Sequence, residues 1–99
     1  MTFVVRLLPQ ALNDRARVFR FGLRYREEVP AALRRLEECD AMILSLATRP
    51  ERFPRSRRYL AGCRWLVCHG YKVFFAVDTK RSTVTVLRIR GIHEDCPTR

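Results

Sequence analysis

The chain has 99 residues, 47% hydrophobic and 30% charged, so it is long enough for one layered core and too short for a separate cofactor-binding domain. The 20 lysines and arginines outnumber 10 acidic residues, and the net charge of +10 predicts an acidic partner, either a nucleic acid or an acidic protein. No apolar run approaches the roughly 18 residues of a membrane span and no secretory signal is evident, so we expect one domain, residues 1–99, in the cytoplasm.

The chain opens with a predicted strand that leads into a helix. Residues 3–8 are mostly apolar, which favours a short strand. Apolar residues then recur at steps of four, three and four, at Leu12, Ala16, Phe19 and Leu23. This spacing places them on one face of a helix, and arginines occupy much of the remaining surface. We therefore expect the Leu12 stripe to face the core.

A second helix is predicted after Glu27 and Glu28, because these glutamates and Pro30 suit the first turn of a helix. Its apolar face keeps the three-four spacing and consists of Ala32, Leu36, Cys39, Ile43 and Leu46. The helix is expected to end near Thr48, before the next proline. The two helices therefore form a hairpin.

An arginine-rich segment separates the helices from the last third of the chain. Residues 49–58 contain two prolines and five arginines, which predicts a loop that either grips phosphates or serves as a solvated connector. Residues 59–68, 71–78 and 83–92 are rich in aromatic and β-branched side chains, which predicts a three-stranded antiparallel meander. This order predicts an α+β fold in which the helical hairpin packs on one face of the sheet.

Four cysteines stand singly, at positions 39, 63, 68 and 96, and are expected to be reduced thiols. Three of them, together with His69 and His93, could be combined into a zinc site on composition alone. The spacing of Cys63 and Cys68 on one predicted strand, however, directs their side chains to opposite faces of the sheet. We therefore expect neither a metal site nor a cofactor.

Taken in order, these elements resemble the RelE/ParE superfamily of bacterial type II toxins over nearly the whole chain. The segments that carry the resemblance are residues 5–14 (VRLLPQALND), 43–52 (ILSLATRPER), 60–67 (LAGCRWLV), 71–78 (YKVFFAVD) and 84–89 (VTVLRI). Each segment alone is weakly diagnostic, because strands with valine and arginine are common. Their order and spacing together identify the superfamily.

This resemblance implies a compact toxin that is neutralised by an antitoxin encoded beside it, through an acidic or amphipathic segment that wraps the toxin. ParE-like members inhibit DNA gyrase by binding, whereas RelE-like members enter the ribosome and cut mRNA. The helix and loop segments are more similar to ParE-like members. We therefore expect growth inhibition through DNA gyrase, with the ribosome and its mRNA as the alternative target.

The closing segment bears on the choice between these targets. ParE-like chains usually close with His-Gly, two arginines and an aspartate, and residues 90–95 (RGIHED) lack that basic pair. A histidine after the last strand is similar to some RNA-cleaving members, so His93 is the candidate acid or base. For a phosphate, the candidate cations are Arg64, Lys72 and Arg90, the first two by similarity to basic positions of RNA-cleaving members. The terminal aromatic residue that many RNA-cleaving members carry is absent.

The turn that ends at Gly70 decides whether these cations share a face. A two-residue turn pairs Val67 with Lys72 and leaves Arg64 on the opposite face. A three-residue turn pairs Leu66 with Lys72, and Arg64 then shares the face of Lys72. We expect the three-residue turn, because glycine suits its last position. The RNA-cleaving hypothesis requires that register.

Three functions are consistent with the sequence. The leading hypothesis is a ParE-like toxin that binds DNA gyrase and performs no chemistry. The second is a metal-independent, ribosome-dependent mRNA endoribonuclease, in which the ribose 2′-hydroxyl attacks the phosphate with help from His93, Arg64, Lys72 and Arg90. The third is an inactive or nucleic-acid-binding relative. Without catalysis, the same side chains are solvated cross-strand residues, contacts at the end of the sheet or antitoxin contacts.

Overall fold

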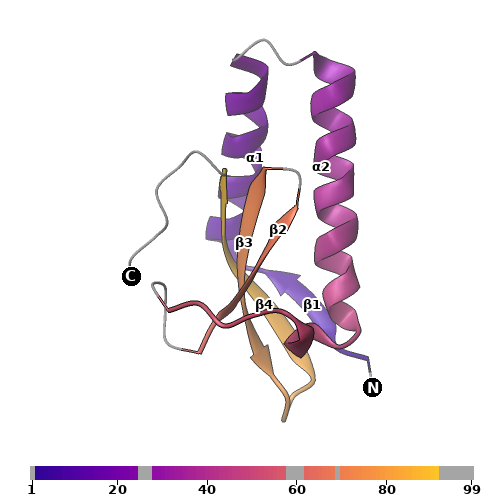
Figure 1. Cartoon of the computed structure of the whole chain (residues 1–99), viewed down its shortest axis with the longest axis vertical. Helices are drawn as coiled ribbons and strands as arrows, with labels where there is room; N and C mark the ends of the chain where they lie inside the picture. Colours follow the sequence, from indigo (N-terminus) through magenta and orange to yellow (C-terminus); the bar gives the residue numbers. More distant parts are fainter. Residues whose placement is uncertain (1, 25–27, 58–61, 69, 92–99) are drawn as a thin grey trace.

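The computed structural model describes residues 2–24, 28–57, 62–68 and 70–91, with the backbone alone for residues 21–24. In chain order the elements are β1 (Val4–Leu7), α1 (Pro9–Arg24), α2 (Val29–Leu44), the short 3₁₀ helices η1 (Ser45–Ala47) and η2 (Pro50–Arg52), β2 (Arg64–Cys68), β3 (Tyr71–Asp78) and β4 (Thr83–Gly91) (Figure 1). This order confirms the predicted α+β fold. None of the described helices has the length and hydropathy that a membrane span needs.

The four strands form one sheet in the order β1-β4-β3-β2. The neighbours β2, β3 and β4 are antiparallel, as the meander predicts, whereas β1 runs parallel to β4. Pairing with β1 ends where Leu7 meets Val86, and α1 continues from there along the remaining edge of β4. The first helix therefore takes the place of a strand beside the second half of β4.

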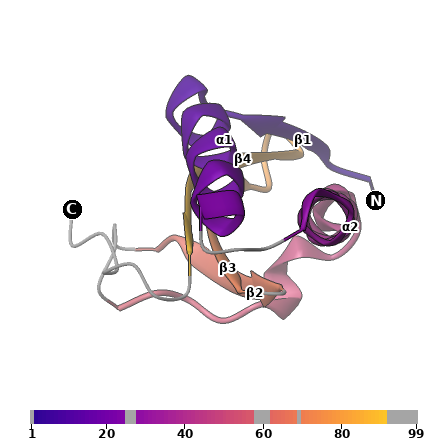
Figure 2. The same ribbon diagram turned by 90° about the horizontal axis from the view of Figure 1, so that it is seen from above.

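Both helices lie on the same side of β2 and β3, and the segment that follows η2 lies on the other side (Figure 2). The main core fills the space between the helices and the sheet and includes Ile43, Leu66, Tyr71, Val73, Phe75 and Ile89. A smaller apolar cluster on the opposite face consists of Cys63, Trp65, Phe74 and Leu87. We call this second face, which the helices leave uncovered, the open face.

The second helix buries the face that its sequence predicts, with Ala32, Cys39 and Ile43 turned inward. The chain then tightens into η1, which buries Leu46. Thr48 is extended and pairs with Thr2, so the helical hairpin ends where Pro50 predicts. Periodicity was sufficient here because every inward residue is apolar.

The buried face of α1 differs from the prediction. Ala11, Asp14 and Val18 are buried, whereas Leu12 is 53% exposed. Residues two apart on a helix point in directions roughly 200° apart, so an inward Asp14 turns Leu12 outward. The prediction of an inward Leu12 was wrong because hydrophobic periodicity assigns carboxylates to the surface, and this carboxylate is held in the interior by β4.

Candidate binding site on the open face of the sheet

A buried carboxylate joins α1 to the end of β4. Asp14 accepts hydrogen bonds from Arg88 Nε and from Arg17 Nη1, each at 2.7 Å. Its Oδ2 also accepts a hydrogen bond of 3.0 Å from the backbone N–H of Ile89. The side chain thus supplies the acceptor that a neighbouring strand would offer at this edge. We call Asp14, Arg17, Arg88 and Ile89 the Asp14 cluster.

The ionisation of Asp14 depends on these partners. Burial acts to raise the pKa of the carboxyl, because an apolar environment disfavours its charged form. Hydrogen bonds from Arg88, from the N–H of Ile89 and from Arg17 act in the other direction, and the net effect is a pKa below the ordinary value. At neutral pH the cluster therefore holds a carboxylate, whose negative charge is matched inside the protein by arginines.

The hairpin between β2 and β3 has a two-residue turn, so the predicted three-residue turn is wrong. Cys68 pairs with Tyr71, and Val67 pairs with Lys72. Gly70 adopts a φ of 87°. A positive φ at the last position is required by two-residue turns of type I′ and by three-residue turns with a bulge, so glycine could not discriminate between the registers.

Arg64 lies on the helix side of the sheet as a consequence of this register. Its cross-strand partner on β3 is Phe75, which belongs to the main core. The guanidinium donates a hydrogen bond of 2.7 Å to the backbone oxygen of Phe53 and lies 3.9 Å from the carboxylate of Glu51. Arg64 thus ties the segment after η2 to the sheet, and it does not meet Lys72.

The other candidate residues are only partly brought together. Lys72 and Arg90 are direct partners across β3 and β4, and both are half-buried. The candidate acid or base, His93, lies outside the described residues, as do the turn residue His69 and the fourth cysteine, Cys96. Two of the predicted phosphate-binding cations are therefore adjacent, and Arg64 is separated from them by the sheet.

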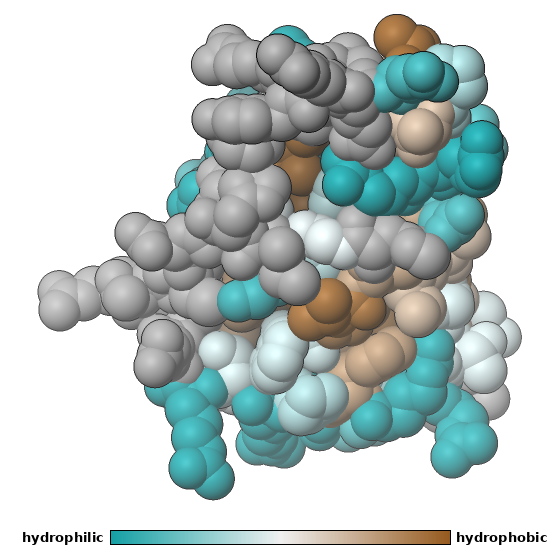
Figure 3. Space-filling view, turned by 45° about the horizontal axis from the view of Figure 1, so that its top comes forward, coloured by the Kyte–Doolittle hydropathy of each residue, from teal (hydrophilic) through white to brown (hydrophobic). Residues whose placement is uncertain are grey.

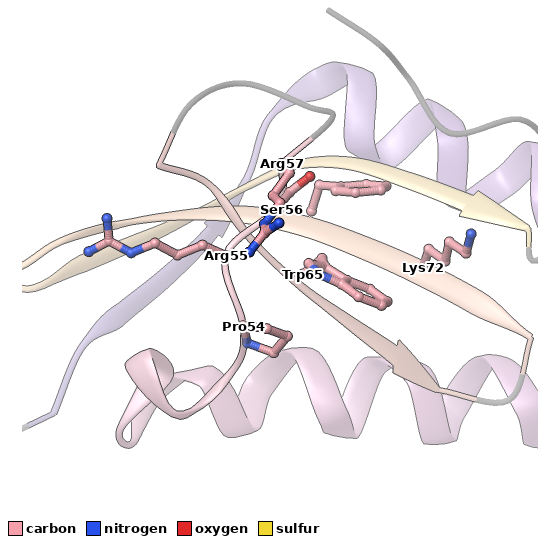
Figure 4. A pocket seen from close by; sticks show the side chains of 7 residues that line it. Pro54, Arg55, Ser56, Arg57, Trp65 and Lys72 are labelled. Atoms are coloured by element: carbon pink, nitrogen blue, oxygen red, sulfur yellow. The ribbon is translucent and has the colours of Figure 1, made fainter.

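The open face carries a cavity of about 410 Å³, lined by Pro54, Arg55, Ser56, Arg57, Trp65, Lys72 and Phe74 (Figure 4). We call it the open-face pocket. Trp65 and Phe74 are cross-strand partners and supply its apolar floor. The residues that line it include three cations and no acidic side chain. In a space-filling view, apolar side chains reach the surface beside hydrophilic ones (Figure 3).

The arginine-rich segment reaches this pocket because it pairs with the outer edge of β2. The N–H of Ser56 donates to the backbone oxygen of Cys63 at 2.8 Å, and the N–H of Trp65 donates to that of Pro54 at 3.1 Å. Its arginine content was the available sequence signal. The pairing itself is long-range, so the sequence analysis did not place Arg55, Arg57 and Trp65 in one site.

The three described cysteines are unsuited to nucleophilic chemistry. Cys39, Cys63 and Cys68 form no disulfide among the described residues. Burial raises the pKa of each thiol, that of Cys39 to about 12, so all three are protonated at neutral pH. Cys63 joins the open-face cluster and Cys68 packs against the main core, which confirms their predicted opposite orientation. No group of three potential metal ligands occurs in the described part of the chain.

Sequence comparison identifies a family over almost the whole length. The model for the ParE toxin of the type II toxin–antitoxin system parDE matches residues 5–95. None of the curated proteins is significantly similar in sequence to the chain.

Solved structures that share the fold include chains from toxin–antitoxin systems. One belongs to the chromosomal ParDE system of P. aeruginosa, with a TM-score of 0.76 and 14% identity over 93% of this chain and 98% of that one. Another is in the RelBE2 toxin–antitoxin complex of Mycobacterium tuberculosis, with a TM-score of 0.70 and 22% identity over 92% of each chain. The isolated RelE toxin of E. coli has a TM-score of 0.60 and 12% identity, over 94% of this chain and 87% of that one.

Proposed function

The chain belongs to the ParE toxin family of type II toxin–antitoxin systems, and from this premise we propose that it stops growth by binding DNA gyrase rather than by cutting RNA. The observation that carries the proposal is the register of β2 on β3, which puts Arg64 and Lys72 on opposite faces of the sheet. Binding requires a complementary surface, whereas cleavage requires several groups around one phosphate.

The chemistry of RNA cleavage explains why this register matters. Attack by a 2′-hydroxyl needs a base, an acid for the leaving oxygen, and cations that stabilise the charge on the phosphorane. Arg64 instead donates to the backbone oxygen of Phe53 on the far face, so it is a structural residue. The open-face pocket, with its aromatic floor and three cations, is suited to holding a partner's surface.

We propose a cognate antitoxin as the second partner, encoded beside the toxin and active with it in the cytoplasm. The ParDE and RelBE2 structures that share the fold come from systems in which a toxin and an antitoxin occur together. The net charge of +10 favours an acidic antitoxin segment, because oppositely charged surfaces associate faster and more selectively.

A brief, tightly controlled induction in a bacterium tests the target. We expect growth arrest, relaxation of a reporter plasmid and inhibition of purified gyrase in a supercoiling assay, with no new mRNA 5′ ends across the genome. Coexpression of the adjacent gene product should restore growth. The His93→Ala variant serves as the control, because a gyrase inhibitor that performs no chemistry does not depend on that imidazole as an acid or base.

One observation favours the endoribonuclease as a second candidate, namely the direct pairing of Lys72 with Arg90 across the sheet. Two adjacent cations on the open face could hold a phosphate. New 5′ ends within translated frames that disappear in His93→Ala would select this function and contradict gyrase binding. A wild-type chain that is harmless on induction would contradict both and leave an inactive relative.

A further inference from the structure

Three segments meet at the end of the sheet opposite the β2–β3 turn (Figure 1). They are the start of β1, the segment of η1 and η2 (residues 45–52), and the turn between β3 and β4 (residues 79–82). The N–H of Phe3 donates to the backbone oxygen of Ala47 at 2.7 Å. The N–H of Val4 donates to the backbone oxygen of Ser82 at 2.8 Å. The start of β1 therefore holds the other two segments beside each other.

Exposed cations lie on both of these segments, and we call four of them the cationic end: Arg49, Arg52, Lys80 and Arg81. The two carboxylates in or next to the same segments have other partners. Glu51 lies 3.9 Å from the guanidinium of Arg64, and Asp78 accepts a hydrogen bond of 3.1 Å from the backbone N–H of Arg81. Within the described residues, neither carboxylate forms an ion pair with a cation of this end.

Backbone strain marks the same end of the molecule. Among the described residues, those other than glycine with a positive φ are Arg49, at 48°, and Ser82, at 51°. A residue with a Cβ disfavours this conformation, and strain of this kind is concentrated at functional sites. Asparagine tolerates it better than arginine does, so folding alone does not favour arginine at position 49. The charge of Arg49 therefore points to a role outside the fold.

A cavity of about 320 Å³ opens at this end and is lined by Ser45, Thr48, Arg49 and Arg52. The guanidinium of Arg52 is held in place because it donates to the backbone oxygens of Thr48 and Arg49 and to the hydroxyl of Ser45. These bonds do not use all of its N–H groups, so donors remain for a ligand. The side chain of Arg49 forms no hydrogen bond or ion pair within the part of the chain that the structure describes.

We propose that the cationic end binds the phosphate backbone of a nucleic-acid duplex. Arginine and lysine side chains and hydroxyl groups are the side-chain donors that contact phosphates, and this end offers both cations and the hydroxyl of Thr48. Phosphates follow each other at about 3.4 Å of axis on each strand, so cations on two adjacent segments can contact more than one. This inference goes beyond the proposed function, because it requires neither gyrase nor an antitoxin.

The side chains at this end favour a duplex over an acidic protein and over a single strand. All four residues that line the cavity are polar, whereas protein interfaces depend on apolar and aromatic anchors at their centre. A single strand requires aromatic side chains on which its bases stack. The aromatic residue beside this cavity, Phe53, is half-buried, and the guanidinium of Arg52 already covers its ring at 4.5 Å.

Titration of a labelled DNA duplex of about 20 base pairs with the full chain measures this binding by fluorescence anisotropy. The logarithm of the affinity should fall linearly with the logarithm of the salt concentration. Two duplexes of unrelated sequence should bind alike, because phosphates carry no sequence information. Trp65, the single tryptophan of the chain, lines the open-face pocket, so its emission should stay unchanged when the duplex binds.

Two double variants with the same change of charge locate the contact. Lys80→Glu combined with Arg81→Glu should weaken duplex binding by about tenfold or more and reduce the salt slope by about 2. Arg20→Glu combined with Arg34→Glu is the matched control on the exposed surfaces of α1 and α2. At about 0.15 M salt this control should weaken binding by less than about threefold, because distant charges are screened.

A single variant separates the strain at Arg49 from its charge. Arg49→Asn keeps a residue that tolerates the left-handed conformation and removes the guanidinium. The urea midpoint should therefore rise, while duplex affinity should fall by about threefold. A role of Arg49 in folding alone predicts unchanged duplex affinity, so that result would remove Arg49 from the binding surface and contradict the proposal.

Three further results would overturn the binding surface. Equal losses in the two double variants would mean that net charge alone attracts the duplex. A changed Trp65 emission would place the duplex at the open-face pocket. Tighter binding of poly-glutamate than of the duplex, lost in the same variants, would assign the cationic end to an acidic protein. None of these results bears on growth arrest or on gyrase supercoiling, so the proposed function stands or fails separately.

Discussion

The Asp14 cluster and the open-face pocket use positive charge in opposite ways. In the cluster, Arg17 and Arg88 surround a carboxylate that is 2% exposed, so their charge is matched inside the protein. In the pocket, three cations adjoin an aromatic floor without an acidic residue among those that line it. A high net charge therefore does not locate a binding site. A buried acceptor such as Asp14 identifies cations that the fold itself uses, here Arg17 and Arg88.

We therefore expect the Asp14 cluster to act in folding stability and the open-face pocket to act in recognition. Changes in the Asp14 cluster should lower the free energy of unfolding, because they leave buried groups without partners. Changes in the cations of the open-face pocket should alter binding to a partner and have little effect on folding, because exposed and half-exposed side chains contribute little to stability. Variants of matched chemistry in the two regions test this distinction.

The largest effect is expected for Asp14→Ala. Removing the carboxylate leaves Arg88 and the N–H of Ile89 without their acceptor, at a cost of about 3 kcal/mol in unfolding free energy. Asp40→Ala is the matched control, since its partner Arg15 and Asp40 itself are 34% and 38% exposed, and an ion pair of that exposure contributes at most about 1 kcal/mol. Urea titrations measure both. Equal losses would mean that the cluster does not stabilise the fold.

Acidification should weaken the fold through the same carboxylate. The pKa of Asp14 is lowered in the folded state, whereas in the unfolded chain it is near the ordinary value of 3.8. Between these two values the unfolded chain binds a proton that the folded chain does not, so stability rises with pH in this window. The contribution is complete above the unfolded pKa and is lost as pH falls through the folded one.

Comparison of the wild type with Asp14→Asn isolates this contribution. From about pH 5 downward, through the unfolded pKa of 3.8, the unfolding free energy of the wild type should decline more steeply than that of the variant, which has no carboxyl to titrate there. Urea midpoints at a series of pH values give the two slopes. Parallel slopes would show that Asp14 titrates alike in both states, and that the arginines do not stabilise its charge.

Local patterns in the sequence were sufficient for most of the fold. The inward face of α2 follows from apolar spacing alone, and β3 occupies the predicted range, Tyr71–Asp78. The strands of the meander are adjacent in the chain, so their pairing needs no long-range information. The parallel pairing of β1 with β4 joins distant segments, and nothing in the sequence analysis anticipated it.

The candidate site was harder to predict for three physical reasons. Asp14 is buried because its carboxylate accepts a hydrogen bond from the N–H of Ile89 on β4. Hydrophobic periodicity along one helix carries no information about such a long-range partner. The register of β2 on β3 depends on whether the turn has two or three residues, and Gly70 suits both turns. The pocket requires the segment around Arg55 to pair with β2, which joins an arginine-rich stretch to an aromatic floor.

A smaller effect should distinguish the cations on the two faces of the sheet. Arg64→Ala removes a charged donor from the backbone oxygen of Phe53 and should cost about 1.5 kcal/mol. Lys72→Ala should cost less than about 0.5 kcal/mol while lowering affinity for the antitoxin. Urea unfolding and Trp65 fluorescence measure the two properties in the same samples. If Arg64→Ala instead reduced binding at unchanged stability, Arg64 would belong to the binding surface.

The smallest effect concerns the turn that sets the register. Gly70→Ala should cost about 1 kcal/mol, because Gly70 has a φ of 87°, which side chains with a Cβ disfavour. The added Cβ would lie 3.6 Å from Arg35 Nη1, an ordinary contact, so packing adds little. Gly62→Ala is the matched control, since Gly62 has the same φ and no atom within 4 Å of the added Cβ. Comparable losses in urea unfolding would confirm a backbone origin.

The register itself should survive Gly70→Ala. A slip of one residue would move every side chain of β2 to the other face, exposing Leu66, which is 3% exposed, and burying Trp65 among the helices. Exposing one core leucine already costs about 2 kcal/mol, more than the strain at the turn. The Trp65 emission should therefore stay at its wild-type maximum. A shifted emission would mean that the turn, rather than the core, decides which face of the sheet carries Arg64.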